Sequence, residues 1–187
     1  VSNGGAIDGD WSAFALTGRT SVEDAFFENY QRAERFAFLP DGMLPMCYPS
    51  DHDRDGFIPS WALWFVIELE EYLARTGDKE LTGRLQPRVE ALMEFFKRYE
   101  NSDGLLEKLD EWVFVEWSKA NELVQDVNYP SNMLYARVLD CAGRLYGLPD
   151  LVSKADALRE AIRKQSFDGS FFVDNAVRKD GKLEVTR

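Results

Sequence analysis

The chain of 187 residues contains one histidine and two cysteines, and it has 22 basic residues against 33 acidic ones. The net charge of −11 argues against a nucleic-acid-binding protein, since phosphates are bound by clustered Lys and Arg. Cys47 and Cys141 have no neighbouring Cys or His, so no zinc site is expected. Cys141 lies in an apolar stripe, whereas Cys47 can be a free thiol or part of a disulfide.

Two further features are missing from the sequence. It has no run of about 18 apolar residues, so no membrane span is expected. The N-terminal segment VSNGGAIDGD does not have the pattern of a signal peptide. Because a signal can be removed from a mature chain, the compartment stays open.

What remains is typical of a globular domain. Hydrophobic residues make up 45% of the chain and aromatic residues 13%, which suffices for a sizeable core. Residues 1–187 are therefore expected to form a single domain.

Apolar residues at helical spacing predict an all-α chain. Ser21 is a good N-cap for a first helix. Four further helices are predicted: one from near Ser60 to Gly77, one from Asp78 to about Tyr99, one from Pro130 to Gly147, and one that begins at Pro149. On the first of these four, core packing is the favoured interpretation for Trp61 and Trp64.

The connections between the helices alternate in length. Those at residues 76–78 and 147–149 are short, and those at residues 36–59 and 100–129 are long. Helical hairpins joined in this way predict that the short turns lie at one rim and the long, functional loops at the other. Near the C-terminus, Asp180-Gly181 between two apolar stretches predicts a β-hairpin.

The segment from Gly42 to Trp117 concentrates tryptophans and carboxylates. Trp112 to Trp117 alternates like a short strand, and the loop Asp51-His52-Asp53-Arg54-Asp55 contains the one histidine. Indole faces stack on the CH faces of sugars, and carboxylates accept hydrogen bonds from sugar hydroxyls. At residues 51–55 a solvated loop or a sugar-binding rim is therefore favoured over a calcium site, because loop position 12 is Ala62 and not an acidic residue.

The order of these parts resembles the catalytic domain of the α-L-rhamnosidases, glycoside hydrolase family 78. Four stretches carry the resemblance: Gly9-Asp10 with Ser12-Ala13-Phe14, Phe57 to Asp78, Asp103-Gly104-Leu105 with Trp112 to Trp117, and Asn132 to Leu139. The fold that it implies is part of an (α/α)6 toroid of antiparallel helical hairpins. The reaction that it implies is inverting hydrolysis of terminal α-L-rhamnosides, with a carbohydrate substrate and no cofactor or metal.

The resemblance also implies the site residues. Asp10 would hold a sugar hydroxyl, Glu116 would hold a hydroxyl or support the attacking water, and Trp117 would stack on the ring. Further substrate contacts are expected from four residues on the loops and the alternating stretch: Asp51, His52, Trp112 and Asn121.

The sequence departs from the family at the positions that carry the chemistry. The general acid should precede Gly9-Asp10 by about seven residues, but Ser2-Asn3-Gly4-Gly5 has no carboxylate, and the general base should lie beyond Arg187. The chain is therefore expected to be a fragment, a truncated reading frame or a diverged toroid. Its partner could be the missing remainder of the ring or a second copy.

Two other interpretations stay open. One is another toroidal sugar enzyme, such as an unsaturated glycuronyl hydrolase or a sugar epimerase, although an epimerase should offer more than one histidine. The other is a helical-repeat scaffold that binds a protein through an exposed groove.

Overall fold

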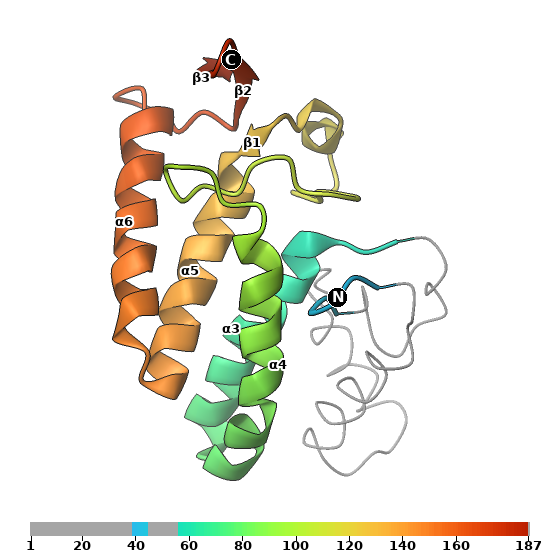
Figure 1. Cartoon of the computed structure of the whole chain (residues 1–187), viewed down its shortest axis with the longest axis vertical. Helices are drawn as coiled ribbons and strands as arrows, with labels where there is room; N and C mark the ends of the chain where they lie inside the picture. Colours follow the sequence, from blue (N-terminus) through green and yellow to red (C-terminus); the bar gives the residue numbers. More distant parts are fainter. Residues whose placement is uncertain (1–38, 45–55, 187) are drawn as a thin grey trace. The chain divides into compact units, whose positions relative to one another are not determined.

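The computed structural model describes residues 39–44 and 56–186 (Figure 1). The chain divides into two compact units, the first ending at Phe95 and the second beginning at Phe96. The expectation that residues 1–187 form one domain stays a prediction.

The first unit contains a helical hairpin. Helix α3 covers Pro59–Thr76 and ends at Gly77, whose φ of 72° lets its N–H donate to the Leu73 carbonyl. Helix α4 covers Lys79–Lys97, and the Asp78 carboxylate accepts from the Leu81 N–H at its start. Both helices begin and end close to where the sequence predicts. The exposure of Trp64, 37%, corrects the expectation that it packs in the core.

A second helical hairpin forms the main body of the second unit. Helix α5 covers Tyr129–Tyr146 and helix α6 covers Pro149–Ser166, and the two run antiparallel side by side (Figure 1). The turn between them is short because Gly147 takes a φ of 64° and ends α5. Gly143 lets the helices approach closely, since a Cβ there would lie 2.6 Å from the Val152 Cγ2. Both helices were predicted.

A small antiparallel sheet lies at the other end of this hairpin. Strands β2, Asn175–Lys179, and β3, Lys182–Thr186, are joined by Asp180-Gly181, where both residues have positive φ. The hairpin confirms the Asp-Gly prediction. The sequence did not reveal the third strand, β1, because Val127–Asn128 is too short to show a period.

A buried asparagine attaches the loop after α4 to helix α5. Asn132 is 0% exposed, and its amide donates to the carbonyls of Leu106 and Asn128 at 3.0 and 2.9 Å. Its Oδ1 accepts from the Leu106 N–H at 2.6 Å. Leu105 and Leu106 are buried beside it, so this loop is part of the core.

The predicted strand at Trp112 to Trp117 is wrong. These residues form an irregular loop, followed by the 3-10 helix η1 at Lys119–Leu123. Alternation alone makes a strand only where another strand supplies a ladder, and here side-chain hydrogen bonds hold the main chain instead.

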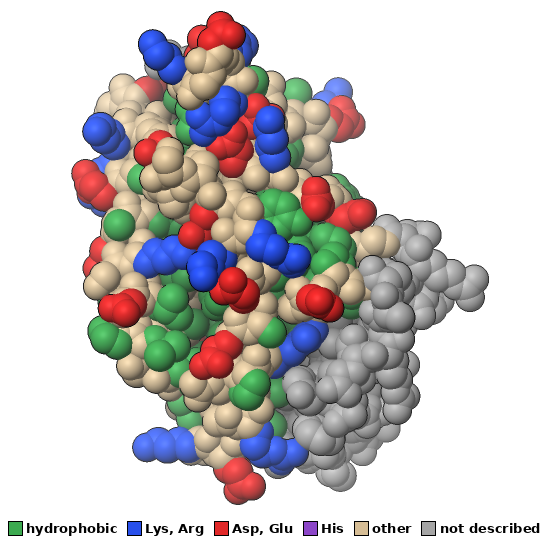
Figure 2. Space-filling model, viewed as in Figure 1, with side chains coloured by type: hydrophobic (Ala, Val, Ile, Leu, Met, Phe, Trp, Pro, Cys, Tyr) green, Lys and Arg blue, Asp and Glu red, His purple; other side chains and the backbone are tan. Residues whose placement is uncertain are grey.

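The surface shows no large field of one sign on the face drawn in Figure 2, where acidic and basic side chains are interspersed among hydrophobic ones. Within residues 39–44 and 56–186, no helix is long and apolar enough to cross a membrane.

Candidate functional site

The loops of the second unit gather at one end of the α5–α6 hairpin, where α5 begins and α6 ends (Figure 1). The short turn after Gly147 lies at the opposite end. Within this unit the prediction of a long-loop rim is confirmed. The loop between α4 and β1 and the C-terminal hairpin supply the polar side chains of this rim.

The loop between α4 and β1 lines an open pocket of about 400 Å³. Leu106 and Val113 supply apolar walls, and Trp112 supplies an aromatic one. The polar residues that line it are Lys108, Glu111, Asn121, Gln125, Asp126 and Asn128. An aromatic wall with a few converging amides and carboxylates is the composition expected of a polar small-molecule site.

Three aromatic rings form an exposed surface on the same loop. The centroids of Trp112 and Phe114 are 5.3 Å apart, those of Phe114 and Trp117 5.1 Å, and those of Trp112 and Trp117 5.9 Å. All three pairs meet edge to face, which is a favourable arrangement of rings. Trp112 is 44% exposed and Trp117 64%, so this three-ring surface is available to a ligand.

Glu116 and Asn121 lie together on this loop. Glu116 is exposed and does not line the pocket. Asn121 lines the pocket, and its Oδ1 accepts from the N–H groups of Val115 and Glu116 at 2.7 and 3.3 Å. Its Nδ2 donates to the Glu116 carbonyl. The Asn121 side chain therefore binds the main chain on which Glu116 is carried.

Two residues of the pocket wall have an unfavourable backbone conformation. Lys108 and Glu111 have φ values of 55° and 62°, a left-handed conformation that side chains with a Cβ adopt rarely. Such conformations persist where surrounding contacts impose them, and they concentrate at functional sites. For Lys108 one such contact is its N–H, which donates to the Asp126 carbonyl at 2.6 Å.

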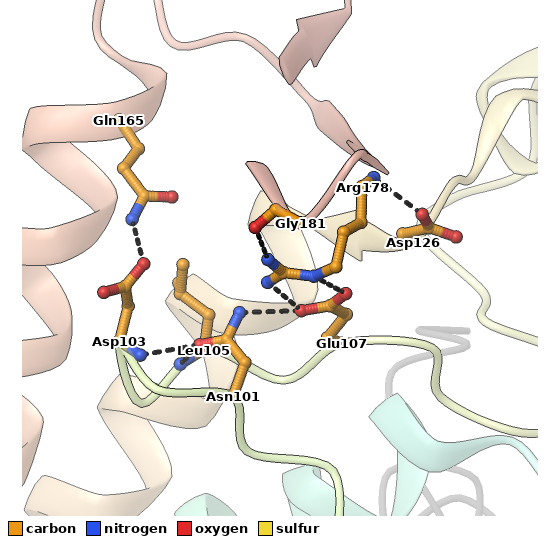
Figure 3. A network of polar contacts seen from close by, with 8 residues as sticks. All are labelled: Asn101, Asp103, Leu105, Glu107, Asp126, Gln165, Arg178 and Gly181. Carbon is orange, nitrogen blue, oxygen red and sulfur yellow. Dashed lines mark hydrogen bonds and ion pairs between the residues drawn. The ribbon is translucent and has the colours of Figure 1, made fainter. Parts of the chain in front are cut away.

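A network of ionic and polar contacts attaches the C-terminal hairpin beside the pocket (Figure 3). Arg178 of β2 donates through Nε and Nη2 to the two oxygens of Glu107, both at 2.6 Å. The Arg178 main-chain N–H donates to Asp126, a residue of the pocket wall, at 2.8 Å. The pKa of Glu107 is lowered, mainly by the hydrogen bonds from Arg178 and further by one from Asn101.

The other side of this network borders a second pocket of about 460 Å³. Asp103 accepts from Gln165 at 3.0 Å, and Gln165 accepts from the Tyr129 hydroxyl at 3.1 Å. These three residues and Arg178 line it. No sequence signal marks the pairing of Glu107 with Arg178, because 71 residues separate them along the chain.

The residues that the sequence singled out fall into three groups. Trp112 and Asn121 both line the first pocket, and Trp117 adjoins it through its ring contact with Trp112. Glu116 lies on the same loop outside the pocket lining. Asp10, Asp51 and His52 lie outside the described residues, as do Gly9 and Ser12-Ala13-Phe14 of the resemblance. The pocket residues Glu111 and Gln125 were not predicted, because isolated polar residues in a loop carry no pattern.

Within residues 39–44 and 56–186, no group of three or more His, Cys, Asp or Glu side chains is placed to hold a metal ion. The carboxyl groups of Asp78, Glu107 and Asp140 have lowered pKa values. A lowered pKa favours the ionised form, so these three groups are unsuited to act as a protonated general acid at neutral pH.

The chain is similar in structure to proteins of known fold. No protein-family model and no curated protein matches the chain. Two solved rhamnosidases share its fold. A GH78 family rhamnosidase of Bacillus sp. GL1 has a TM-score of 0.50 at 21% identity, over 63% of this chain. A rhamnosidase from Klebsiella oxytoca with rhamnose bound has a TM-score of 0.54 at 21% identity, over 72% of this chain.

The described helices thus have the fold of part of a rhamnosidase. The match covers 13% of the Bacillus protein and 28% of the Klebsiella protein. The chain therefore resembles these enzymes as a partial copy. The likeness shows a glycoside-hydrolase-like, mainly helical fold, in agreement with the fold class predicted from sequence.

Proposed function

We propose that the chain is a carbohydrate-binding part of a glycoside hydrolase of the α-L-rhamnosidase type, and that the first pocket and its three-ring surface contact the sugar. The observation that carries the proposal is the exposure of Trp112 and Trp117 beside a pocket lined with amides and carboxylates. A contiguous group of exposed aromatic rings is typical of a binding site, and sugars offer apolar CH faces for stacking.

Each residue has a distinct part in this proposal. Trp117 stacks on the sugar ring, with Trp112 and Phe114 holding it from the side. Glu116 is exposed and accepts a hydrogen bond from a sugar hydroxyl. Asp10 holds a second hydroxyl, as the family resemblance implies. The substrate class is a terminal α-L-rhamnoside, and the two helical hairpins belong to a toroid.

Binding is expected without family-level hydrolysis by this chain alone. Inverting hydrolysis needs a protonated acid and an ionised base about 6.5–9.5 Å apart, with a water between them. By resemblance, the acid position falls on Ser2-Asn3-Gly4-Gly5, which has no carboxylate. Release of rhamnose from a rhamnoside at rates typical of rhamnosidases would contradict this part of the proposal.

A tryptophan-fluorescence titration with L-rhamnose tests the sugar site. The unmodified chain is expected to show saturable quenching. The affinity for rhamnose obtained from the titration should be at least tenfold weaker in Trp117→Ala and unchanged in Trp64→Ala. The Trp64 variant is a matched control, because Trp64 is also an exposed tryptophan but lies on α3. A folded chain, verified by circular dichroism, that shows no saturable response to rhamnose or other monosaccharides would refute the proposal.

A protein-binding scaffold is the alternative, and one observation favours it. Phe171 is 76% exposed, and the neighbouring Phe167 and Phe172 are exposed with their ring centroids 5.0 Å apart. Such a cluster suits a protein surface better than a monosaccharide. The scaffold interpretation predicts that sugars are ignored and that the chain self-associates as its concentration rises, with Phe171→Ser weakening the association.

A further inference from the structure

The side chain of Asn121 holds the loop that carries both Glu116 and the three-ring surface. We infer that Asn121 is a positioning residue for this site, and that it acts through the main chain of Val115 and Glu116 rather than as a direct sugar ligand. Its importance for sugar binding rests on the proposed function, whereas its control of the ring arrangement does not.

The hydrogen-bonding capacity of the amide supports this assignment. An asparagine side chain offers two acceptor positions on Oδ1 and two N–H donors on Nδ2. Both acceptor positions are used, by the N–H groups of Val115 and Glu116. One donor is used by the Glu116 carbonyl. A single N–H therefore remains for any ligand, although Asn121 lines the pocket.

The location of the contacts explains their effect on the rings. Val115 and Glu116 lie in the sequence between Phe114 and Trp117, whose centroids are 5.1 Å apart. Among the described residues no strand pairs with residues 112–117, so Asn121 takes the place of the ladder that would otherwise order this segment. The Glu116 carbonyl also accepts from the Ser118 N–H at 2.8 Å, which tightens the turn that leads into η1.

The test uses a spectroscopic signal of the rings themselves. The centroids of Trp112 and Trp117 are 5.9 Å apart. Two indoles at this distance couple their electronic transitions and give an exciton couplet, a paired positive and negative band, in far-ultraviolet circular dichroism. Trp117→Phe defines the spectrum without this band. Asn121→Ala is expected to lose the band and to weaken rhamnose binding at least tenfold. Gln125→Ala is the matched control for the band alone, because Gln125 lines the same pocket but its side chain accepts from Thr186 rather than holding residues 115 and 116.

Asn121→Asp is a second test variant. Its readout is the pH dependence of the paired band, which a purely structural residue would not change. A carboxylate can accept from both N–H groups but repels the Glu116 carbonyl, so the paired band should be weak at neutral pH. Protonation near pH 4, the ordinary range for Asp, restores the donor, and the band should return. Should Asn121→Ala fail to fold, this variant carries the test.

Three outcomes decide the matter. Loss of the band in Asn121→Ala, with its retention in Gln125→Ala, supports the positioning role. Retention of the band in Asn121→Ala overturns that role, and weakened sugar binding in the same variant would then make Asn121 a direct ligand. If the unmodified chain binds no sugar but Asn121→Ala still loses the band, the proposed function fails and the positioning of the rings stands.

Discussion

Arg178 and Glu107 join the C-terminal hairpin to the loop after α4 through two parallel hydrogen bonds, Nε to Oε1 and Nη2 to Oε2, each 2.6 Å long. The third guanidinium nitrogen, Nη1, donates to the Gly181 carbonyl at 2.8 Å and so reaches the tip of the hairpin. The side chain of Glu107 is 11% exposed, so solvent screens this pair less than a surface ion pair.

The ion pair predicts a pH-dependent stability. Because the folded-state pKa of Glu107 lies below its ordinary value of 4.5, the pair stabilises the fold above pH 4.5, and the effect disappears as the pH falls through the folded-state pKa. Glu107→Gln should lower the free energy of unfolding by about 1–2 kcal/mol at pH 7. Urea unfolding should show the two proteins converging in acid.

Glu184→Gln is the control for this effect. Glu184 pairs with Lys179 on the same hairpin at 3.0 Å, but both side chains are more than half exposed. Its substitution should change stability little at any pH, since surface pairs contribute little. A difference between Glu107→Gln and the unmodified chain that stays constant from pH 7 to acid would contradict the linkage.

The buried amide of Asn132 predicts a large loss of stability on truncation. Asn132→Ala removes three hydrogen bonds and leaves the Leu106 N–H and carbonyl without that partner in the core. The free energy of unfolding should fall by about 3 kcal/mol. Chemical denaturation measures it, and Asn101→Ala, on a more accessible turn, should cost less. A loss below that of Asn101→Ala would show that water replaces the missing amide.

The two helical glycines Gly143 and Gly83 predict opposite responses to alanine. A Cβ at Gly143 would lie 2.6 Å from the Val152 Cγ2 and 3.1 Å from the Leu148 carbonyl oxygen, whereas one at Gly83 would meet nothing within 4 Å. Gly143→Ala should destabilise by about 1–3 kcal/mol through overpacking. Gly83→Ala should stabilise by about 0.5–1 kcal/mol, because alanine favours the helix.

Thermal unfolding of both variants compares them directly. Equal shifts of the melting temperature in the same direction would contradict the close approach of α5 and α6 at Gly143.

The Tyr99 hydroxyl should lose its proton at a higher pH than an ordinary tyrosine. Burial, and after it a 2.7 Å hydrogen bond to Asp110, raise its pKa from 10.0 to about 12. The difference in ultraviolet absorbance between the unmodified chain and Tyr99→Phe should therefore develop near pH 12. Asp110→Asn should lower the midpoint while leaving the burial contribution. A Tyr99 midpoint near 10 would show that the phenol is solvated.

Much of the helical framework could be predicted because its signals are local. Pro59, Pro130 and Pro149 mark helix starts, and Gly77 and Gly147 mark ends, since left-handed backbone suits glycine. The Asp180-Gly181 turn was predictable for the same reason. The third strand and η1 were not, because two to five residues are too few to establish a period.

The site was predictable only in part. Residue type and family resemblance pointed to Trp112, Trp117, Glu116 and Asn121, and the structure places all four on one loop. The assumption that an alternating pattern means a strand was wrong, because a strand needs a partner that local sequence does not specify. Asn121 appeared to be a candidate ligand, whereas its amide is mostly used by the loop itself.

The local order of residues determined where the four described α-helices begin, where α3 and α5 end, and that the Asp-Gly turn forms a hairpin, because capping and turn preferences act within a few residues. It also determined that Trp112, Glu116 and Trp117 follow one another within six residues between two helices. Only the tertiary structure decided that Arg178 meets Glu107 and that Trp112 meets Trp117 beside a pocket. These contacts arise when packing brings distant or irregular segments together, and no periodicity in the sequence encodes them.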